Sequence, residues 1–295
     1  MTSSSVYTLT NRQSGNLAFK IFAFDGNSSF DHIQRNNYFT LMLITRGNGK
    51  IRVDFSEYDF DGSTFFAFYP YQPFMFSAQA DLKGFVIHFH PDFFCIHRHH
   101  KEIACNGTLF NHVYDQPLVL VNEGNKKVIL GLIGQIMDEM KIGGAQHEEV
   151  IIAYLKVLLI TATRMKTEQQ SVTTDPTVDG KSWYVLQNLK DAIEENFRSK
   201  HSAGAYAEML NLSPGALARI TKTHWNKTVS DLINERIIIE AKRELYLTRK
   251  TIKEIAYGLG YEDEYYFSRF FKANTDVSPQ LYRETVGFAR GEVGV

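Results

Sequence analysis

In this 295-residue chain, the two histidines His88 and His90 have a spacing that is typical of metal ligands. One residue separates them in the strand-like stretch G-F-V-I-H-F-H, so both side chains would lie on the same face of a strand, where imidazoles can bind a metal ion. A metal site needs further ligands, such as an acid a few residues on, and position 94 is Phe. We therefore expect no metal and no cofactor, with a metal-binding enzyme as the alternative.

The rest of the chain has no residue set that is typical of catalysis. It has no Ser/His/Asp combination, no phosphate-binding loop and no glycine-rich nucleotide motif. Its two cysteines, Cys95 and Cys105, are expected to be free thiols in a reducing cytosol. No window is apolar enough for a transmembrane helix, and the N-terminus M-T-S-S-S does not resemble a signal peptide. We expect a cytoplasmic protein that is not an enzyme and does not contact a membrane.

The stretch 251–283 predicts a helix-turn-helix. Thr251 and Glu254 form a T-x-x-E capping box at a helix start, and Gly260 suits a tight turn because glycine adopts positive φ without steric cost. Asp263 can cap a second helix. That helix would bury three aromatic residues at i, i+3 and i+4 spacing, which are Phe267, Phe270 and Phe271. In DNA-binding versions of this motif the second helix lies in the major groove, whereas the alternative is a helical hairpin in some other domain.

An upstream stretch, A-Y-A-E-M-L-N-L-S-P-G-A-L-A-R-I, repeats this pattern. Its first helix matches at an offset of 49 residues (256−207) and its second at an offset of 50 (269−219). Ser213 followed by Pro214 is a favoured helix start. An apolar stripe from Val229 to Leu245 predicts one long helix that connects two tandem helix-turn-helix units.

Residues 182–285 resemble the DNA-binding domain of the AraC/XylS family of bacterial transcription regulators. The resemblance depends on I-x-E-I-A-x-x-x-G-Y, F-S-R-F-F-K and S-P-x-x-Y-R. In that family both recognition helices enter successive segments of the major groove. The matching base-reading positions with polar side chains are Arg219, Glu264, Tyr265, Ser268 and Arg269.

The sequence departs from the family at several of these positions. Gly215 and Ala218 also match base-reading sites but carry no polar group, so Arg219 is expected to read bases mainly by itself in the first unit. Three acids, 262–264, begin the second recognition helix; acids repel phosphate, although a Glu can accept a hydrogen bond from the cytosine amino group. Asn226 and Asp276 replace the usual glycines and tolerate the left-handed region better than most residues.

The charge of the chain is divided unevenly. Residues 1–180 hold 15 Lys and Arg against 18 Asp and Glu, net −3, and residues 181–290 hold 17 against 14, net +3. Non-specific attraction to phosphate should therefore be modest. The lysines that flank the two units are possible phosphate contacts, and each could equally be a solvated surface residue: Lys222, Lys227, Lys250, Lys253 and Lys272.

The N-terminal part, 1–166, is expected to begin with a loose arm over 1–16 and to continue as short strands over 17–91, with a hairpin at R-G-N-G. This pattern resembles the cupin-like effector domain of AraC-type regulators. Several aromatic residues could line a small-molecule pocket, and the alternative is that they pack the core. The pocket residues that we predict are Phe39, Phe66, Phe68, Phe76 and His88.

Two helical stretches follow, over 126–140 and 148–165, joined by Gly143 and Gly144. We expect them to form an antiparallel pair that covers the barrel. In the resembled regulators a helix of this pair makes the dimer contact. The matching residues are Ile151, Leu155 and Leu158. The alternative is a helical layer that packs only within the chain.

The predicted fold class is therefore α+β and multidomain. A cupin-like antiparallel β-barrel with a helical pair occupies 1–166, a flexible linker 167–181, and an all-α domain with two helix-turn-helix units 182–290. We expect a homodimeric, sequence-specific transcription regulator that binds double-stranded DNA, responds to a small molecule and, by resemblance, contacts RNA polymerase as an activator. The alternatives are a cupin-type metal-binding enzyme and a DNA-binding regulator without an effector.

Overall fold

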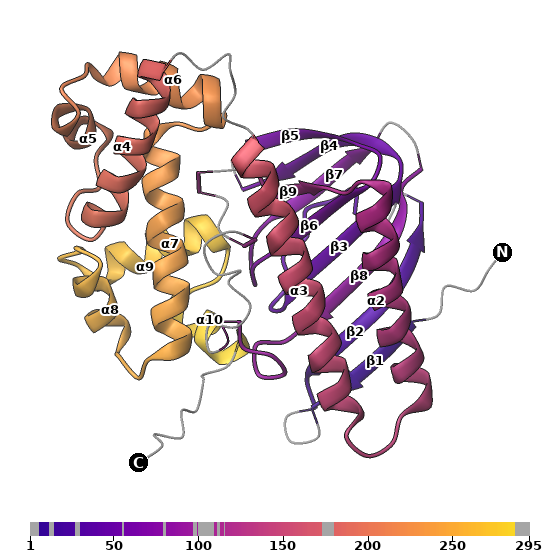
Figure 1. Ribbon diagram of the computed structural model, residues 1–295. Helices are drawn as coiled ribbons and strands as arrows, with labels where there is room; N and C mark the ends of the chain where they lie inside the picture. Colours follow the sequence, from indigo (N-terminus) through magenta and orange to yellow (C-terminus); the bar gives the residue numbers. More distant parts are fainter. Residues whose placement is uncertain are drawn as a thin grey trace. The chain divides into compact units, whose positions relative to one another are not determined.

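The computed structural model describes residues 6–11, 15–26, 30–54, 56–78, 81–96, 99, 109–110, 113–114, 116–172 and 180–286. The described chain has a β-rich unit up to position 172 and a helical unit from position 180 (Figure 1); positions 54, 56, 113, 114 and 116 group with the helical unit. The expected linker 167–181 is wrong at both ends, because one helix continues to Val172 and the next begins at Gly180. The middle of that linker, 173–179, lies outside the described residues.

The β-rich unit contains two sheets. The larger has the strand order β1-β2-β8-β3-β6-β9, and the smaller has the order β5-β4-β7. The pairs β1–β2, β2–β8, β3–β8, β3–β6, β6–β9 and β4–β7 are antiparallel. The strands are β1 (Val6–Thr10), β2 (Leu17–Asp25), β3 (Phe39–Arg46), β4 (Asn48–Val53), β5 (Ser56–Asp61), β6 (Thr64–Phe68), β7 (Phe74–Ala78), β8 (Lys83–Phe89) and β9 (Leu118–Leu120). The predicted antiparallel β architecture is confirmed.

Two sequence-based expectations fail in this unit. The arm expected at 1–16 contains β1, which pairs with β2 through Val6–Phe22 and Leu9–Phe19. The predicted hairpin at R-G-N-G is also wrong, because β3 and β4 belong to different sheets. Gly47 and Gly49, with φ of 116° and 156°, instead turn the chain from one sheet into the other.

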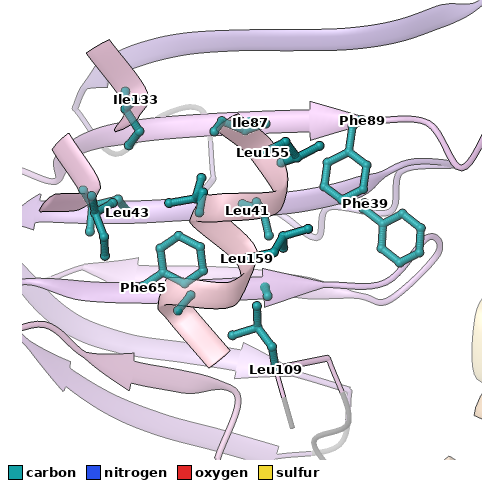
Figure 2. Packing of buried hydrophobic residues seen from close by; sticks show 14 of the residues in the cluster. Phe39, Leu41, Leu43, Phe65, Ile87, Phe89, Leu109, Ile133, Leu155 and Leu159 are labelled. Carbon is teal, nitrogen blue, oxygen red and sulfur yellow. The ribbon is translucent and has the colours of Figure 1, made fainter. Parts of the chain in front are cut away.

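The two faces of the larger sheet bury different clusters, because alternate residues of a strand point to opposite sides. Phe39, Leu41 and Leu43 of β3 pack against two helices, as Figure 2 shows. Met42 and Ile44, which point to the other face of β3, pack with aromatic residues of the smaller sheet. We call these the helix-side cluster and the inter-sheet cluster.

The helices of this unit are α2 (Glu123–Ile142) and α3 (His147–Val172). Their positions agree with the two predicted helical stretches, and Gly143 and Gly144 between them have φ of 62° and 112°. Ile133, Leu155 and Leu159 point at the larger sheet (Figure 2). The prediction that this pair covers the sheet is confirmed.

The dimer contact predicted at Ile151, Leu155 and Leu158 is wrong for those side chains. Each is fully buried in the helix-side cluster of its own chain. Exposing these side chains to reach a partner would cost about 25 cal/mol of folding free energy for each Å² of apolar surface that leaves the core.

The helical unit is built around α7, which runs between two groups of shorter helices (Figure 1). Its helices are α4 (Gly180–Asn196), α5 (Ala203–Met209), α6 (Pro214–Trp225), α7 (Val229–Leu247), α8 (Ile252–Gly258), α9 (Glu264–Thr275) and α10 (Pro279–Val286). The predicted long connecting helix is confirmed. Among the helices in the described ranges, none has both the length and the apolar character needed to cross a membrane.

Candidate nucleic-acid interface

The second helix-turn-helix consists of α8, a turn and α9, and local interactions fix its boundaries. The hydroxyl of Thr251 accepts from the N–H of Glu254 at 3.1 Å, and the Glu254 carboxylate accepts from the N–H of Thr251 at 2.6 Å. Gly260 has φ of 82°, and Asp263 caps α9 by accepting from the N–H of Tyr265. The predicted capping box, glycine turn and aspartate cap are all confirmed.

The first unit, α5 and α6, repeats this arrangement with different residues. Ser202 caps α5 and Ser213 caps α6, with Pro214 in the first turn of α6. Asn211 lies in the turn with φ of 54°, at the place where the second unit has Gly260. The internal repeat therefore corresponds to two tandem helix-turn-helix units, as predicted.

Both recognition helices end at a residue in the left-handed region. Asn226 follows α6 with φ of 56°, and Asp276 follows α9 with φ of 63°. Glycine is the usual residue at such a helix end, because other side chains meet the backbone there. Asn and Asp are the exceptions that the sequence predicted.

The two recognition helices expose arginines at equivalent positions. Arg219 on α6 and Arg269 on α9 are both exposed, and the described part of the chain gives neither guanidinium an acidic partner. Tyr265 is 77% exposed, whereas Glu264 and Ser268 are half-buried. The predicted base-reading residues are therefore split between one polar group on α6 and four on α9.

The predicted phosphate-binding lysines do not share one environment. Lys222, Lys253 and Lys272 are exposed. Lys250 is also exposed, but its ammonium group lies 2.8 Å from the carboxylate of Glu244.

The prediction that Lys227 contacts a DNA phosphate is wrong. Its side chain is only 4% exposed, and its ammonium group forms an ion pair with Glu235 at 2.6 Å. A lysine that is both buried and paired cannot contact a phosphate without breaking that pair.

Helix α4 supports the first unit with one face. Leu189 and Ile193 are fully buried and Leu186 nearly so, as expected for the start of the domain. Tyr184, near the start of the same helix, is 63% exposed.

An ion network around Glu240 was not predicted. Glu240 lies on α7 with a side chain that is 5% exposed, and its carboxylate accepts from Arg198, Arg236 and Arg243 at 2.6, 3.2 and 3.0 Å. Burial alone would raise the pKa of Glu240, but the guanidinium groups outweigh burial and hold its pKa below the ordinary value. A glutamate in the middle of the apolar stripe of α7 was the one available signal in the sequence.

In the β-rich unit, the residues predicted to line an effector pocket separate into two places. Phe66, Phe68 and Phe76 belong to the inter-sheet cluster, where Phe66 and Phe76 meet edge-on at 5.4 Å. Phe39 is in the helix-side cluster, on the face of the larger sheet that packs against the helices (Figure 2). It cannot line a site together with the other three.

His88 lies on the inter-sheet side, in a polar row across three adjacent strands. It is directly opposite Lys20 of β2 and Thr40 of β3, and its Nδ1 atom is 3.0 Å from the Thr40 hydroxyl. The ring of Tyr38 lies 4.3 Å from that of His88. Burial, helped by the Lys20 charge, lowers the pKa of His88 to about 3, so the imidazole is neutral near pH 7.

His90, the second histidine of the predicted pair, has a different partner. Its Nδ1 atom accepts from the N–H of Asp92 at 3.2 Å. Within the described residues, no three His, Cys, Asp or Glu side chains gather closely enough to hold a metal ion. Of the two cysteines, Cys95 is buried as a free thiol and Cys105 lies outside the described residues.

Two family profiles match the chain. Residues 206–285 match a profile described as a helix-turn-helix domain, and residues 21–97 match one described as an AraC-like ligand binding domain. The first covers the end of α5, then α6 to α9 and most of α10, and the second covers β3 to β8 together with the second half of β2.

Relatives of known role are transcription regulators. The arabinose operon regulatory protein of Escherichia coli K12 is 27% identical over 162 residues, which is 55% of this chain and 53% of that protein. The raffinose operon regulatory protein RafR of Pediococcus pentosaceus is 30% identical over 95 residues, 32% of this chain and 34% of that one. The matches thus span about half or less of these relatives. Among solved structures, ToxT of Vibrio cholerae O395 aligns over 99% of this chain and 98% of its own with 16% identity and a TM-score of 0.41.

Proposed function

Because the chain belongs to the AraC/XylS family of transcription regulators, we propose that it binds promoter DNA sequence-specifically through α6 and α9. The observation that carries this proposal is the pair Arg219 and Arg269. Both are exposed at equivalent positions of the two recognition helices, on units that α7 connects. An arginine that is free of acids can form a bidentate contact with guanine in the major groove.

Selection of random double-stranded DNA by the full chain at physiological salt tests this function. We expect a site with two short base blocks about one helical turn apart, since two linked recognition helices reach successive major-groove segments on one face of the duplex. The doubly substituted Arg219→Ala, Arg269→Ala chain serves as the control and should lose the first base block and most of the second. Failure of the unsubstituted chain to enrich any motif would contradict sequence-specific binding.

We also propose that the β-rich unit binds a small molecule with an anionic or strongly hydrogen-bonding group. The support is the polar row of Lys20, Thr40 and His88 beside aromatic side chains. The described residues offer Lys20 no acidic partner; its ammonium group lies 4.8 Å above the ring of Phe22. A ligand carboxylate could complete this arrangement at little desolvation cost to the lysine.

Paired probes can test this effector proposal: benzoate against benzamide, and hexanoate against hexanamide. At least one carboxylate should raise the unfolding temperature of the β-rich unit while its amide does not, and Lys20→Gln should abolish the difference. No stabilisation by either carboxylate would favour the alternative, a regulator without a small-molecule effector.

A homodimer would need a surface other than the three buried residues first predicted. Among the described side chains of α2 and α3, the large apolar residues that are exposed are Val128, Ile142 and Val157. We propose that these faces meet in a dimer, and sedimentation of a Val128→Glu, Val157→Glu variant tests it. A dimer of unchanged stability would contradict this interface.

The remaining parts of the proposal follow from the family. We propose a cytoplasmic activator that acts on RNA polymerase and catalyses no reaction of its own. Transcription from the selected site with purified polymerase, with and without the chain, measures the sign of regulation.

A further inference from the structure

The loop that leads from α4 into the first helix-turn-helix unit touches the second unit directly, in addition to the packing of both units on α7. The loop after α4 meets the turn between α8 and α9. In that contact Nη1 of Arg198 donates to the carbonyl of Gly258 at 3.1 Å, and the ring of His201 lies 4.8 Å from that of Tyr261. The backbones are so close that a Cβ on Gly260 would lie 2.1 Å from the Arg198 carbonyl oxygen.

The same arginine also binds the connecting helix. Its Nη2 atom lies 2.6 Å from Glu240 and 3.6 Å from Glu244, both on α7. One guanidinium group therefore joins three parts: the end of the first unit's supporting helix, the connecting helix and the end of α8. Lysine could not replace it fully, because an ammonium group is a point charge without the planar fork that serves two acceptors in fixed directions.

The consequence concerns the distance between the recognition helices. A protein with two linked reading helices recognises base blocks whose separation matches its own geometry. One inserted base pair displaces the second block by about 3.4 Å and rotates it by about a tenth of a turn. A rigid pair of units cannot follow this displacement, whereas a loosely joined pair can.

We propose that Arg198 is a positioning residue that holds α6 and α9 at a fixed separation, and so makes the protein select operators by the spacing of their two base blocks. This inference rests on the proposed DNA-binding function. Arg198 itself is remote from the base-reading positions in the chain and acts through Glu240 and Gly258.

The test uses the full chain and three duplexes: the selected site, and the same site with one base pair inserted or removed between its blocks. Dissociation constants are measured at one salt concentration for the unsubstituted chain, Arg198→Gln, Arg198→Lys and Arg243→Gln. Arg243 is the matched control, because it binds the same Glu240 carboxylate but lies on α7 itself and, in the part of the chain that is described, joins no second element. Circular dichroism and tryptophan fluorescence establish that each variant is folded.

For the unsubstituted chain we expect a change of one base pair to weaken binding about tenfold, comparable to the loss of one base contact. Arg198→Gln should reduce this spacing penalty to about threefold or less, since the second unit can then follow the displaced block. Arg198→Lys should fall between the two, and Arg243→Gln should keep the full penalty.

Two results would overturn the inference while leaving the proposed function intact. One is that Arg198→Gln weakens binding to all three duplexes by the same factor, as expected for a residue whose role is merely structural. The other is an equal loss of spacing selection in Arg243→Gln. If the unsubstituted chain itself prefers no sequence, the proposed function fails first, and the inference fails with it.

Discussion

The two helix-turn-helix units share a backbone but differ in the residue at the turn. In both units the turn between the helices contains a residue in the left-handed region, which is Asn211 in the first unit and Gly260 in the second. Only at the second turn does another backbone, the carbonyl of Arg198, occupy the place of a Cβ atom. Similar backbone torsions therefore accept a side chain at Asn211 and exclude one at Gly260, because the Arg198 carbonyl lies against the second turn.

The recognition helices differ in a related way. Helix α9 presents four polar candidates for base contact, whereas α6 presents Arg219 beside Gly215 and Ala218. We infer that base selectivity is concentrated in the second unit and that the first contributes one strong contact. Four experiments test the contrast between the units.

The largest effect is expected at the turns. Gly260→Ala should destabilise the helical unit by more than about 2 kcal/mol, because it adds both a left-handed penalty and a backbone clash. Asn211→Ala should cost about 1 kcal/mol, from the torsion alone. Both tryptophans, Trp183 and Trp225, lie in the helical unit, so their fluorescence in a urea titration reports its unfolding.

A matched variant separates torsion from contact. Gly260→Asn supplies a residue that adopts the left-handed region in the first unit, but it also carries a Cβ atom. We expect it to be nearly as damaging as Gly260→Ala. Stability close to that of the unsubstituted chain would show that torsion, and not the approach of Arg198, requires the glycine.

The next effect concerns the two arginines. Arg219→Ala and Arg269→Ala should each weaken binding to the selected site by about 1–3 kcal/mol, the usual value of a bidentate base contact. Repeating the selection with each variant distinguishes the units. Arg219→Ala should erase the first base block, whereas Arg269→Ala should leave part of the second, read by Glu264 and Ser268. Equal losses on selected and random DNA would instead identify both arginines as phosphate contacts.

A smaller effect is expected at the helix starts. Thr251→Ala should destabilise the helical unit by about 1 kcal/mol, and Ser202→Ala by less, because α5 lacks the reciprocal carboxylate of a capping box. The hydrogen bond from the Thr251 N–H, followed by that from its hydroxyl, lowers the pKa of Glu254 below its ordinary 4.5.

The sign of the pH dependence follows from that shift. A lowered pKa in the folded state gives stability that is present above the pKa of the unfolded state and is lost as the pH falls through the folded value. The difference between the unsubstituted chain and Thr251→Ala should therefore narrow as the pH falls below 4.5, while the difference for Ser202→Ala stays constant. Urea titrations between pH 7 and about pH 3.5 cover this range.

The smallest effect is expected at Lys222 and Lys272, which are equivalent residues at an offset of 50 (272−222). If each contacts one phosphate, either change to Ala should weaken selected and random DNA equally and reduce the salt slope of binding by about 0.9. Lys227→Met is the matched control, because its buried ion pair removes it from the DNA. If the salt slope of binding changes in Lys227→Met and not in Lys222→Ala, then Lys227 contacts a phosphate and Lys222 does not, contrary to our assignment.

The sequence was most informative where neighbours along the chain decide the structure. The capping box at Thr251, the serine cap at Ser213 and the left-handed residues at 226 and 276 were all predictable, because each depends on residues within about one helical turn. Periodicity also identified α2, α3 and α7. The turn signal at the R-G-N-G segment failed, because whether β3 pairs with β4 depends on what lies beside the segment in space.

The candidate site was predictable in part, for the same reason. Arg219 and Arg269 occupy positions that the internal repeat makes equivalent, so their place on the recognition helices followed from spacing. The burial of Lys227 beside Glu235 and the pairing of Lys250 with Glu244 did not, because ion pairs depend on partners that no local pattern specifies. Alternation along β3 places Phe39 opposite Met42, but only the packed helices and sheets assign a cluster to each face.

By itself, then, the sequence determined that this chain has two tandem helix-turn-helix units joined by one helix, because short-range hydrogen bonds and helical periodicity specify those elements. Only the tertiary structure decided which face of α3 is buried, which lysines reach solvent, and that Arg198 joins the two units through Glu240 and Gly258. These features arise between residues far apart in the chain, where the packing of apolar faces brings together charges that no sequence window contains.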